Sequence, residues 1–105
     1  RELDYIKMRE QQSLILKEIY LNIKGLVYLP GQAAQVANLL DRIEQCYHRD
    51  NTVKGLLEEL EQLMRQMKEE QLPQTREEFE ARAVLFYILK QLQIFLELKR
   101  QYILD

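Results

Sequence analysis

The sequence predicts an all-α fold, an antiparallel up-down four-helix bundle with two long helices (first and last) and two short ones between them. Three observations predict it. The 105 residues include only 3 Gly and 2 Pro, so few positions interrupt regular structure. The residue types that dominate (Leu, Glu, Gln, Lys and Arg) are good helix formers. Apolar residues recur at spacings of three and four, which is the period of one helix face.

The first helix is predicted over residues 2–29. Its core stripe is expected to consist of Leu16, Ile19, Tyr20, Ile23, Leu26 and Val27, extended toward the N-terminus by Tyr5, Met8 and Ile15. Gly25 lies inside this pattern, where it would either permit close helix contact or mark fraying before the turn. The break at Leu29-Pro30-Gly31 ends the segment, because Pro restricts the residue before it.

Two shorter helices are predicted over residues 32–49 and 53–70, separated by the capping residues Asp50, Asn51 and Thr52. The second helix is expected to bury a face that begins with small residues: Ala33, Val36, Ala37, Leu40, Ile43 and Tyr47. The third helix repeats close to a heptad, and its expected core residues are Val53, Leu56, Leu57, Leu60, Leu63, Met64 and Met67.

The fourth helix is predicted over residues 76–103, and its start carries the most specific local signal in the chain. Thr75 followed by Glu78 forms a capping box, in which the Thr hydroxyl accepts the Glu78 N–H and the carboxylate reaches back. The apolar face is wide, which indicates a central position or a second contact surface; it comprises Phe79, Ala83, Leu85, Phe86, Ile88, Leu89, Leu92, Ile94, Phe95, Leu96, Leu98, Tyr102 and Ile103.

Composition limits the compartments and partners that we expect. A net charge of -2, from 15 basic and 17 acidic residues, gives no basic stripe, so we expect no nucleic-acid partner. The single cysteine, Cys46, forms no internal disulfide and gives no support for an oxidising compartment. No apolar run approaches the roughly 20 residues of a membrane span. Because the sequence begins with Arg1, we expect a soluble fragment, one domain over residues 1–105, of a longer protein.

The residues give little support for catalysis or cofactor binding. Cys46 and His48 are two ligands, which do not make a zinc site, and His48 stands too near a helix end for a phosphotransfer histidine. Ser13 is the only serine, no Gly-rich phosphate loop occurs, and no Glu-x-x-His pair suits a di-iron bundle. We therefore expect no enzyme, no metal and no cofactor.

A small-molecule pocket is the sharper alternative. Tyr20 and Tyr87 could line it, although tyrosines at helical spacing more often lie at the edge of a core. Arg76 and Arg82, near the start of the fourth helix, could hold an anionic ligand, although pairing with neighbouring acids is the commoner use of such residues. These four residues are the candidate ligand site.

The stretch LPQTREEFEARAVLF at residues 72–86 resembles the C-terminal domain of the putative aromatic acid exporter family, membrane proteins of Gram-positive bacteria. The stretch MREQQ at residues 8–12 and the pair Asn51-Thr52 followed by Leu56-Leu57 fit the same pattern. The resemblance implies a helical domain on the cytoplasmic side of the cell membrane, joined to the membrane-spanning region of its own parent chain. It implies no catalytic residues.

Three functions follow as hypotheses. The first is an accessory or regulatory domain of an exporter that acts by homo-oligomerisation or by docking a partner through its helix faces. The second is a sensing bundle that holds a small aromatic acid between tyrosines and an arginine. The third is a free-standing adaptor.

Overall fold

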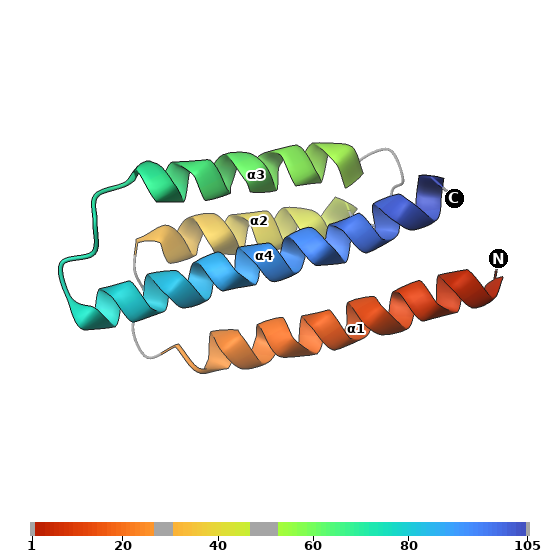
Figure 1. The fold of residues 1–105 in the computed structure, drawn as a ribbon, viewed down its shortest axis with the longest axis horizontal. Coiled ribbons are helices and arrows are strands. Elements are labelled where there is room, and N and C mark those ends of the chain that lie inside the picture. The colour runs from red at the N-terminus through yellow and green to blue at the C-terminus, as the bar shows by residue number, and fades with distance from the viewer. Residues whose placement is uncertain (1, 27–30, 47–52, 105) are drawn as a thin grey trace.

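A computed structural model describes residues 2–26, 31–46 and 53–104. These residues form four α-helices and no strand: α1 (Glu2–Lys24), α2 (Gln32–Cys46), α3 (Val53–Glu69) and α4 (Arg76–Leu104). The molecule is elongated, with extents of 49 × 24 × 19 Å, and successive helices run in opposite directions (Figure 1). The predicted fold class is confirmed, including two long helices at the start and end of the chain and two short helices between them in sequence.

The centre of the bundle is α4, which packs against each of the other three helices. The two short helices also pack against each other, so that α2, α3 and α4 surround a common core. In contrast, α1 lies along α4 and has only marginal contact with α2 and α3 (Figure 1). The wide apolar face of the fourth helix therefore reflects a central position.

The core is supplied mainly by α3 and α4. Every apolar position predicted for α3 is buried except Met64, which is half-buried. The side chains of Leu60, Ile88, Leu89, Leu92 and Leu96 are fully enclosed. In α2 the face is rotated from the expected one, since Leu39 is buried and Ala37 is exposed. Three positions predicted for the α4 face, Phe79, Ala83 and Ile94, are exposed, because α4 has one side without a neighbouring helix.

The core stripe predicted for α1 is wrong at half of its described positions. Met8 and Ile19 are buried and Ile15 and Leu26 are half-buried, whereas the other four are exposed: Tyr5, Leu16, Tyr20 and Ile23. Since α1 packs mainly on α4, it covers only a narrow line at alternating spacings of four and three, which consists of Met8, Gln12, Ile15, Ile19, Asn22 and Leu26. The two polar members of this line, Gln12 and Asn22, are the ones that the apolar pattern missed.

The end of α1 comes at Lys24, earlier than the predicted residue 29. The Gly25 N–H still donates to the Leu21 carbonyl at 3.1 Å, and the Leu26 N–H turns back more tightly to Ile23 at 3.1 Å. Gly25 therefore lies in the turn that closes the helix. Val27, Pro30, Tyr47 and the capping residues at positions 50–52 lie outside the described residues.

The cap on α4 is present as predicted. The Glu78 N–H donates to the Thr75 hydroxyl at 3.0 Å, and the Phe79 N–H donates to the Thr75 carbonyl at 3.0 Å. In a standard capping box the Glu78 carboxylate would accept the N–H of Thr75. Here it accepts the N–H of the preceding residue, Gln74, at 3.3 Å. The Thr75 hydroxyl thus satisfies one of the N–H groups that the first turn of a helix leaves without a partner.

Replacing the capping side chain gives a first stability prediction. Thr75→Ala removes the acceptor for the Glu78 N–H, and we expect the free energy of unfolding to fall by about 0.5–2 kcal/mol. Chemical denaturation followed by circular dichroism measures the change. Thr75→Ser keeps the hydroxyl and is the matched control. Equal losses in the two variants would mean that the hydroxyl does not cap the helix.

Candidate functional site

The attachment of α1 to α4 depends on polar side chains. Gln12 is 1% exposed, and its Nε2 donates to the Phe95 carbonyl at 2.9 Å. Its Oε1 accepts from Arg9 Nη1 at 2.9 Å. Because buried polar groups have a high cost unless they are paired, these bonds favour one register of α1 on α4.

A second polar group lies further along the same helix pair. Asn22 Nδ2 donates to Gln91 Oε1 at 3.0 Å, and Gln91 Nε2 donates to the Glu18 carboxylate at 3.1 Å. At the opposite end, the rings of Tyr5 and Tyr102 meet edge to face with centroids 5.5 Å apart. The two long helices are thus joined along most of their length, and α1 has only marginal contact with α2 and α3.

The side of α1 that points away from α4 is unusually apolar. Helical periodicity places one line of residues opposite the buried stripe, and we call this line the outer face of α1: Leu3, Ile6, Glu10, Leu14, Lys17 and Leu21. Its four apolar members are well exposed, at 62% for Leu3, 51% for Ile6, 61% for Leu14 and 68% for Leu21. Single exposed apolar residues are ordinary, but four of them along one helix face, interrupted only by Glu10 and Lys17, favour an interaction surface.

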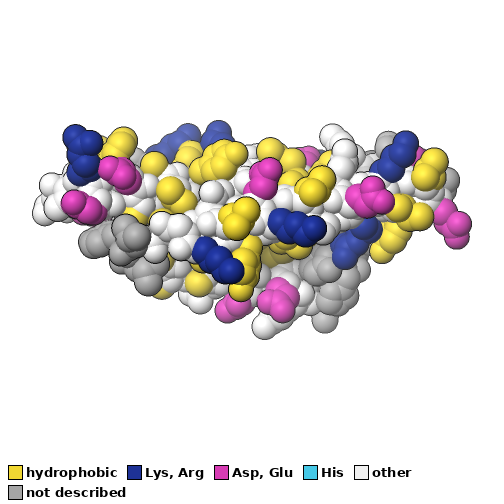
Figure 2. All heavy atoms as spheres, turned by 90° about the horizontal axis from the view of Figure 1, so that it is seen from below, with side chains coloured by type: hydrophobic (Ala, Val, Ile, Leu, Met, Phe, Trp, Pro, Cys, Tyr) yellow, Lys and Arg dark blue, Asp and Glu magenta, His cyan; other side chains and the backbone are white. Residues whose placement is uncertain are grey.

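The exposed apolar surface continues around the side of the helix. A shallow groove of about 500 Å³ runs along α1, lined by Ser13, Leu16, Lys17, Tyr20 and Leu21. The ammonium group of Lys24 lies 5.1 Å from the Tyr20 ring centroid. Figure 2 looks onto this side of the molecule and shows hydrophobic side chains spread along its length between charged ones. This side of α1 is the candidate interaction surface.

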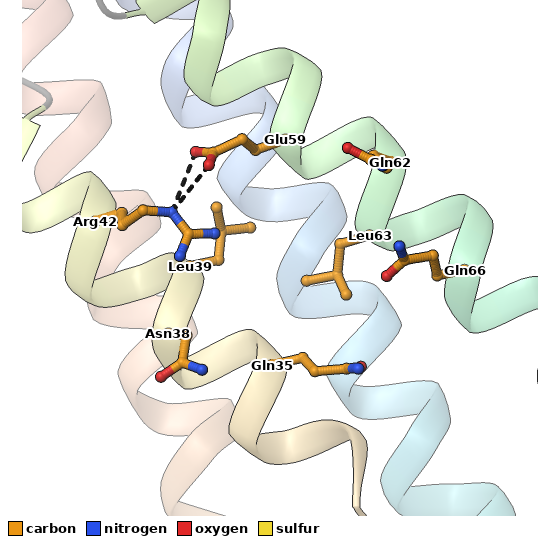
Figure 3. Close-up of a pocket in the computed structure, with 8 residues that line it drawn as sticks. All are labelled: Gln35, Asn38, Leu39, Arg42, Glu59, Gln62, Leu63 and Gln66. Carbon is orange, nitrogen blue, oxygen red and sulfur yellow. Dashed lines mark hydrogen bonds and ion pairs between the residues drawn. The ribbon is translucent and has the colours of Figure 1, made fainter.

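A polar groove of about 260 Å³ lies between α2 and α3 (Figure 3). Its rim is formed by amide side chains from both helices and by the ion pair of Arg42 with Glu59, whose Nε and Oε1 are 3.0 Å apart; the amides are Gln35, Asn38, Gln62 and Gln66. Both charged side chains are about half exposed, so the pair adds little stability. The groove offers hydrogen bonds without a nucleophile.

A third groove, of about 250 Å³, lies beside the start of α4 and the end of α3. It combines two aromatic rings, Phe79 and Phe86, with two cationic side chains, Lys68 and Arg82. The Lys68 ammonium lies 5.6 Å from the Phe86 ring centroid. Arg82 is held in place, because its Nη1 donates to the Gln71 carbonyl at 2.7 Å and lies 3.5 Å from the Glu78 carboxylate.

Gln32, the first residue of α2, also lines this third groove and is 4% exposed. Its Nε2 donates to the Glu70 carboxylate at 3.0 Å, which fixes the orientation of the amide, since a carboxylate only accepts. The Gln32 Oε1 is buried, and none of the described residues donates a hydrogen bond to it. Such an acceptor is costly in a folded protein unless a water or a ligand donates to it.

The four residues predicted as a ligand site lie in different places. Arg82 lines the groove at the start of α4, and Tyr20 lines the groove on α1. Arg76 is the exposed first residue of α4, and Tyr87 is 55% exposed on the same helix. The aromatic neighbours of Arg82 are phenylalanines, and the sequence pattern assigned Phe79 and Phe86 to the core. Gln32 gave no signal at all in the sequence.

Among the described residues, no three His, Cys, Asp or Glu side chains are grouped as metal ligands would be. His48 lies outside those residues, so the expectation that Cys46 and His48 do not form a zinc site stays a prediction. None of the helices in the described part of the chain combines the length and the apolar character that crossing a bilayer requires.

These features define the chain as an all-α helical-bundle domain with an exposed apolar helix face. The chain matches, over residues 2–100, the family described as the putative aromatic acid exporter C-terminal domain. It belongs to this family, and the resemblance seen in the sequence is confirmed.

Two relatives illustrate the membership. Protein YqjA of Bacillus subtilis (strain 168) is 33% identical over 95 residues, which cover 90% of this chain and 30% of YqjA. The crystal structure of a putative membrane protein from Clostridium difficile 630 superposes with a TM-score of 0.89 at 33% identity, covering 98% of this chain and 61% of that one. The chain therefore spans less than a third of YqjA.

Proposed function

We propose that this domain is an accessory or regulatory part of an integral membrane protein, an aromatic acid exporter, and that it acts by oligomerisation or partner docking through α1. The observation that carries the proposal is the exposed apolar outer face of a helix that is attached to one neighbour only. Family membership supplies the membrane link. The proposed role is non-catalytic, since the polar groups described serve packing, capping and ion pairing.

We propose further that the domain lies on the cytoplasmic side of the membrane, joined to the membrane-spanning region of its own parent chain. Its single cysteine suits a reducing compartment, because small domains exposed to oxidising surroundings usually rely on disulfide pairs. A free-standing adaptor is the rival. Full-length sequence with several apolar stretches of roughly 20 residues before Arg1 would exclude that rival.

The outer face of α1 is tested by making it polar. We expect Leu14→Gln combined with Leu21→Gln to weaken self-association or partner binding about tenfold or more while the helical circular dichroism signal stays unchanged. Sedimentation velocity over a range of concentrations measures self-association. Leu72→Gln, at an 85% exposed residue between α3 and α4, is the matched control and should have no effect. Equal behaviour of the two variants would contradict a role for this face.

The aromatic-acid alternative is favoured by one specific observation, the third groove with its buried Gln32 Oε1, which accepts no hydrogen bond from the described residues. A ring could stack on Phe79 or Phe86 while a carboxylate meets Lys68 or Arg82, and a hydroxyl on the ring could donate to Gln32. A pocket for an aromatic acid combines an apolar wall for the ring with a cationic group for the carboxylate, and a hydroxyl contact adds specificity. Of the four residues predicted from the sequence, only Arg82 enters this version of the site.

Ligand screening by nuclear magnetic resonance tests the alternative. We expect 4-hydroxybenzoate at millimolar concentration to shift the Phe79 and Phe86 ring signals, with benzoate binding more weakly because it cannot donate to Gln32 Oε1. Lys68→Gln should weaken binding several-fold, whereas Lys54→Gln, at an exposed residue of the same helix, should not. Absence of shifts with both acids at millimolar concentration would exclude this site.

A further inference from the structure

The outer face of α1 has two charged residues at its centre, and they have opposite signs. Glu10 and Lys17 are exposed and lie two helical turns apart, so they project from nearly the same line along the helix. Apolar residues flank them, with Leu3 and Ile6 toward the N-terminus and Leu21 toward the C-terminus. The sequence of properties along the face is therefore apolar, acidic, apolar, basic, apolar.

This order is complementary to itself when it is reversed. We propose that the outer face of α1 pairs with the same face of a second copy of this chain, antiparallel, with the two-fold axis between Ser13 and Leu14. The inference rests on the proposed function and specifies its oligomeric form. In this register, residues whose numbers sum to 27 lie opposite each other, so Glu10 faces the partner's Lys17 and Lys17 faces the partner's Glu10.

The same register also pairs apolar residues. Ile6 lies opposite the partner's Leu21, and Leu14 meets its own copy beside the two-fold axis. At the ends of the pair, Leu3 lies opposite the partner's Lys24, whose aliphatic stem packs on apolar surface while its ammonium group stays in water.

Other occupants fit this face less well. A parallel pair of copies would place Glu10 against Glu10 and Lys17 against Lys17, which is repulsive. A lipid surface favours an apolar face free of acids, with basic residues at its edges, whereas Glu10 lies in the middle of this one. Polar residues inside an apolar helix seam commonly select one register and orientation at some cost in affinity.

The size of the surface sets the expected strength. A helix of 23 residues is roughly 35 Å long, and one pair of such helices buries less than the about 1,200 Å² of a standard interface. We therefore expect a reversible dimer that forms at micromolar or higher concentration and dissociates on dilution.

Charge reversal tests the register. We expect Glu10→Lys and Lys17→Glu, made singly, each to raise the dimer dissociation constant about tenfold, because each converts two attractive contacts into repulsive ones. The double variant should return it to within about threefold of the original value. Sedimentation equilibrium measures all four chains, and circular dichroism confirms that these exposed substitutions leave the fold intact.

Cross-linking tests the orientation independently of affinity. The test uses a chain that carries Cys46→Ala. In the proposed pair, position 13 of one copy and position 13 of the other are offset by about 1.5 Å along the helix direction, so two Ser13→Cys thiols lie close together. The two copies of position 3 are offset by about 30 Å, so two Leu3→Cys thiols lie far apart. A short bis-maleimide should join copies through position 13 and not through position 3. Cross-linking at both positions would indicate a parallel pair and overturn the proposal.

Two further results would overturn the inference, and they are distinguishable. Unchanged association in both single charge variants, together with loss in the Leu14→Gln and Leu21→Gln chain, would reject this register and leave the interaction role of α1 intact. A strict monomer at the highest attainable concentration would reject the second copy as occupant. Loss of partner binding by the outer-face variant would then still support the proposed function.

Discussion

Leu92→Ala should lower the free energy of unfolding by about 2–5 kcal/mol, the range for removing a fully enclosed leucine side chain. Leu92 is 0% exposed and lies on α4, which contacts every other helix. Truncation leaves a cavity that several elements would have to move together to fill. Since a domain of this size has about 5–15 kcal/mol of stability, the loss is a large fraction of the total.

Urea denaturation, monitored by circular dichroism at 222 nm, measures this change. The matched control is Ile94→Ala, two residues along the same helix, because Ile94 is 55% exposed. We expect that variant to differ from the original chain by no more than about 0.5 kcal/mol. Similar losses for the two variants would mean that α4 is not the centre of the bundle or that its buried face is rotated.

Gln12→Ala should destabilise the chain by about 1–3 kcal/mol, although glutamine is usually a surface residue. The substitution removes the bond from Gln12 Nε2 to the Phe95 carbonyl, takes away the acceptor of Arg9 Nη1 and leaves space between α1 and α4. The loss should appear first in α1, whose packing depends on α4 alone. Amide hydrogen exchange of α1 is therefore the more sensitive measurement.

Two controls separate the causes. Gln11→Ala changes the exposed neighbour and should have no measurable effect. Gln12→Met keeps the volume and loses only the hydrogen bonds, so it should cost about 1 kcal/mol. If Gln12→Ala and Gln11→Ala behaved alike, the attachment of α1 would not depend on the buried amide.

Much of the fold could be predicted from apolar spacing because α3 and α4 each face more than one neighbour. Their apolar residues are dense and regular, and the positions predicted for α3, from Val53 to Met67, lie in or beside the core. The start of α4 could be located to the residue, since the Thr75 cap is a local interaction that needs no tertiary context.

The buried face of α1 could be predicted only in part. That helix has one apolar line against α4 and another that is exposed, and a periodicity argument cannot rank them. The line of α1 that packs on α4 includes Gln12 and Asn22. Their hydrogen bonds to α4 form only when the two helices are aligned as they are in the folded chain. The candidate ligand groove could not be predicted for a similar reason. Gln32 becomes a candidate ligand contact only because folding buries it beside Arg82 and Phe86, and the sequence does not show that burial.

The attachment of α1 to α4 and the proposed association through the outer face of α1 can be tested together. Amide hydrogen exchange of the chain is measured in dilute and in concentrated solution and compared helix by helix. We predict the slowest exchange in the middle of α4 at both concentrations, and slower exchange at high concentration in α1 alone. If exchange slowed only in α2 or α3, or did not change in α1 over the whole concentration range, α1 would not be the associating helix.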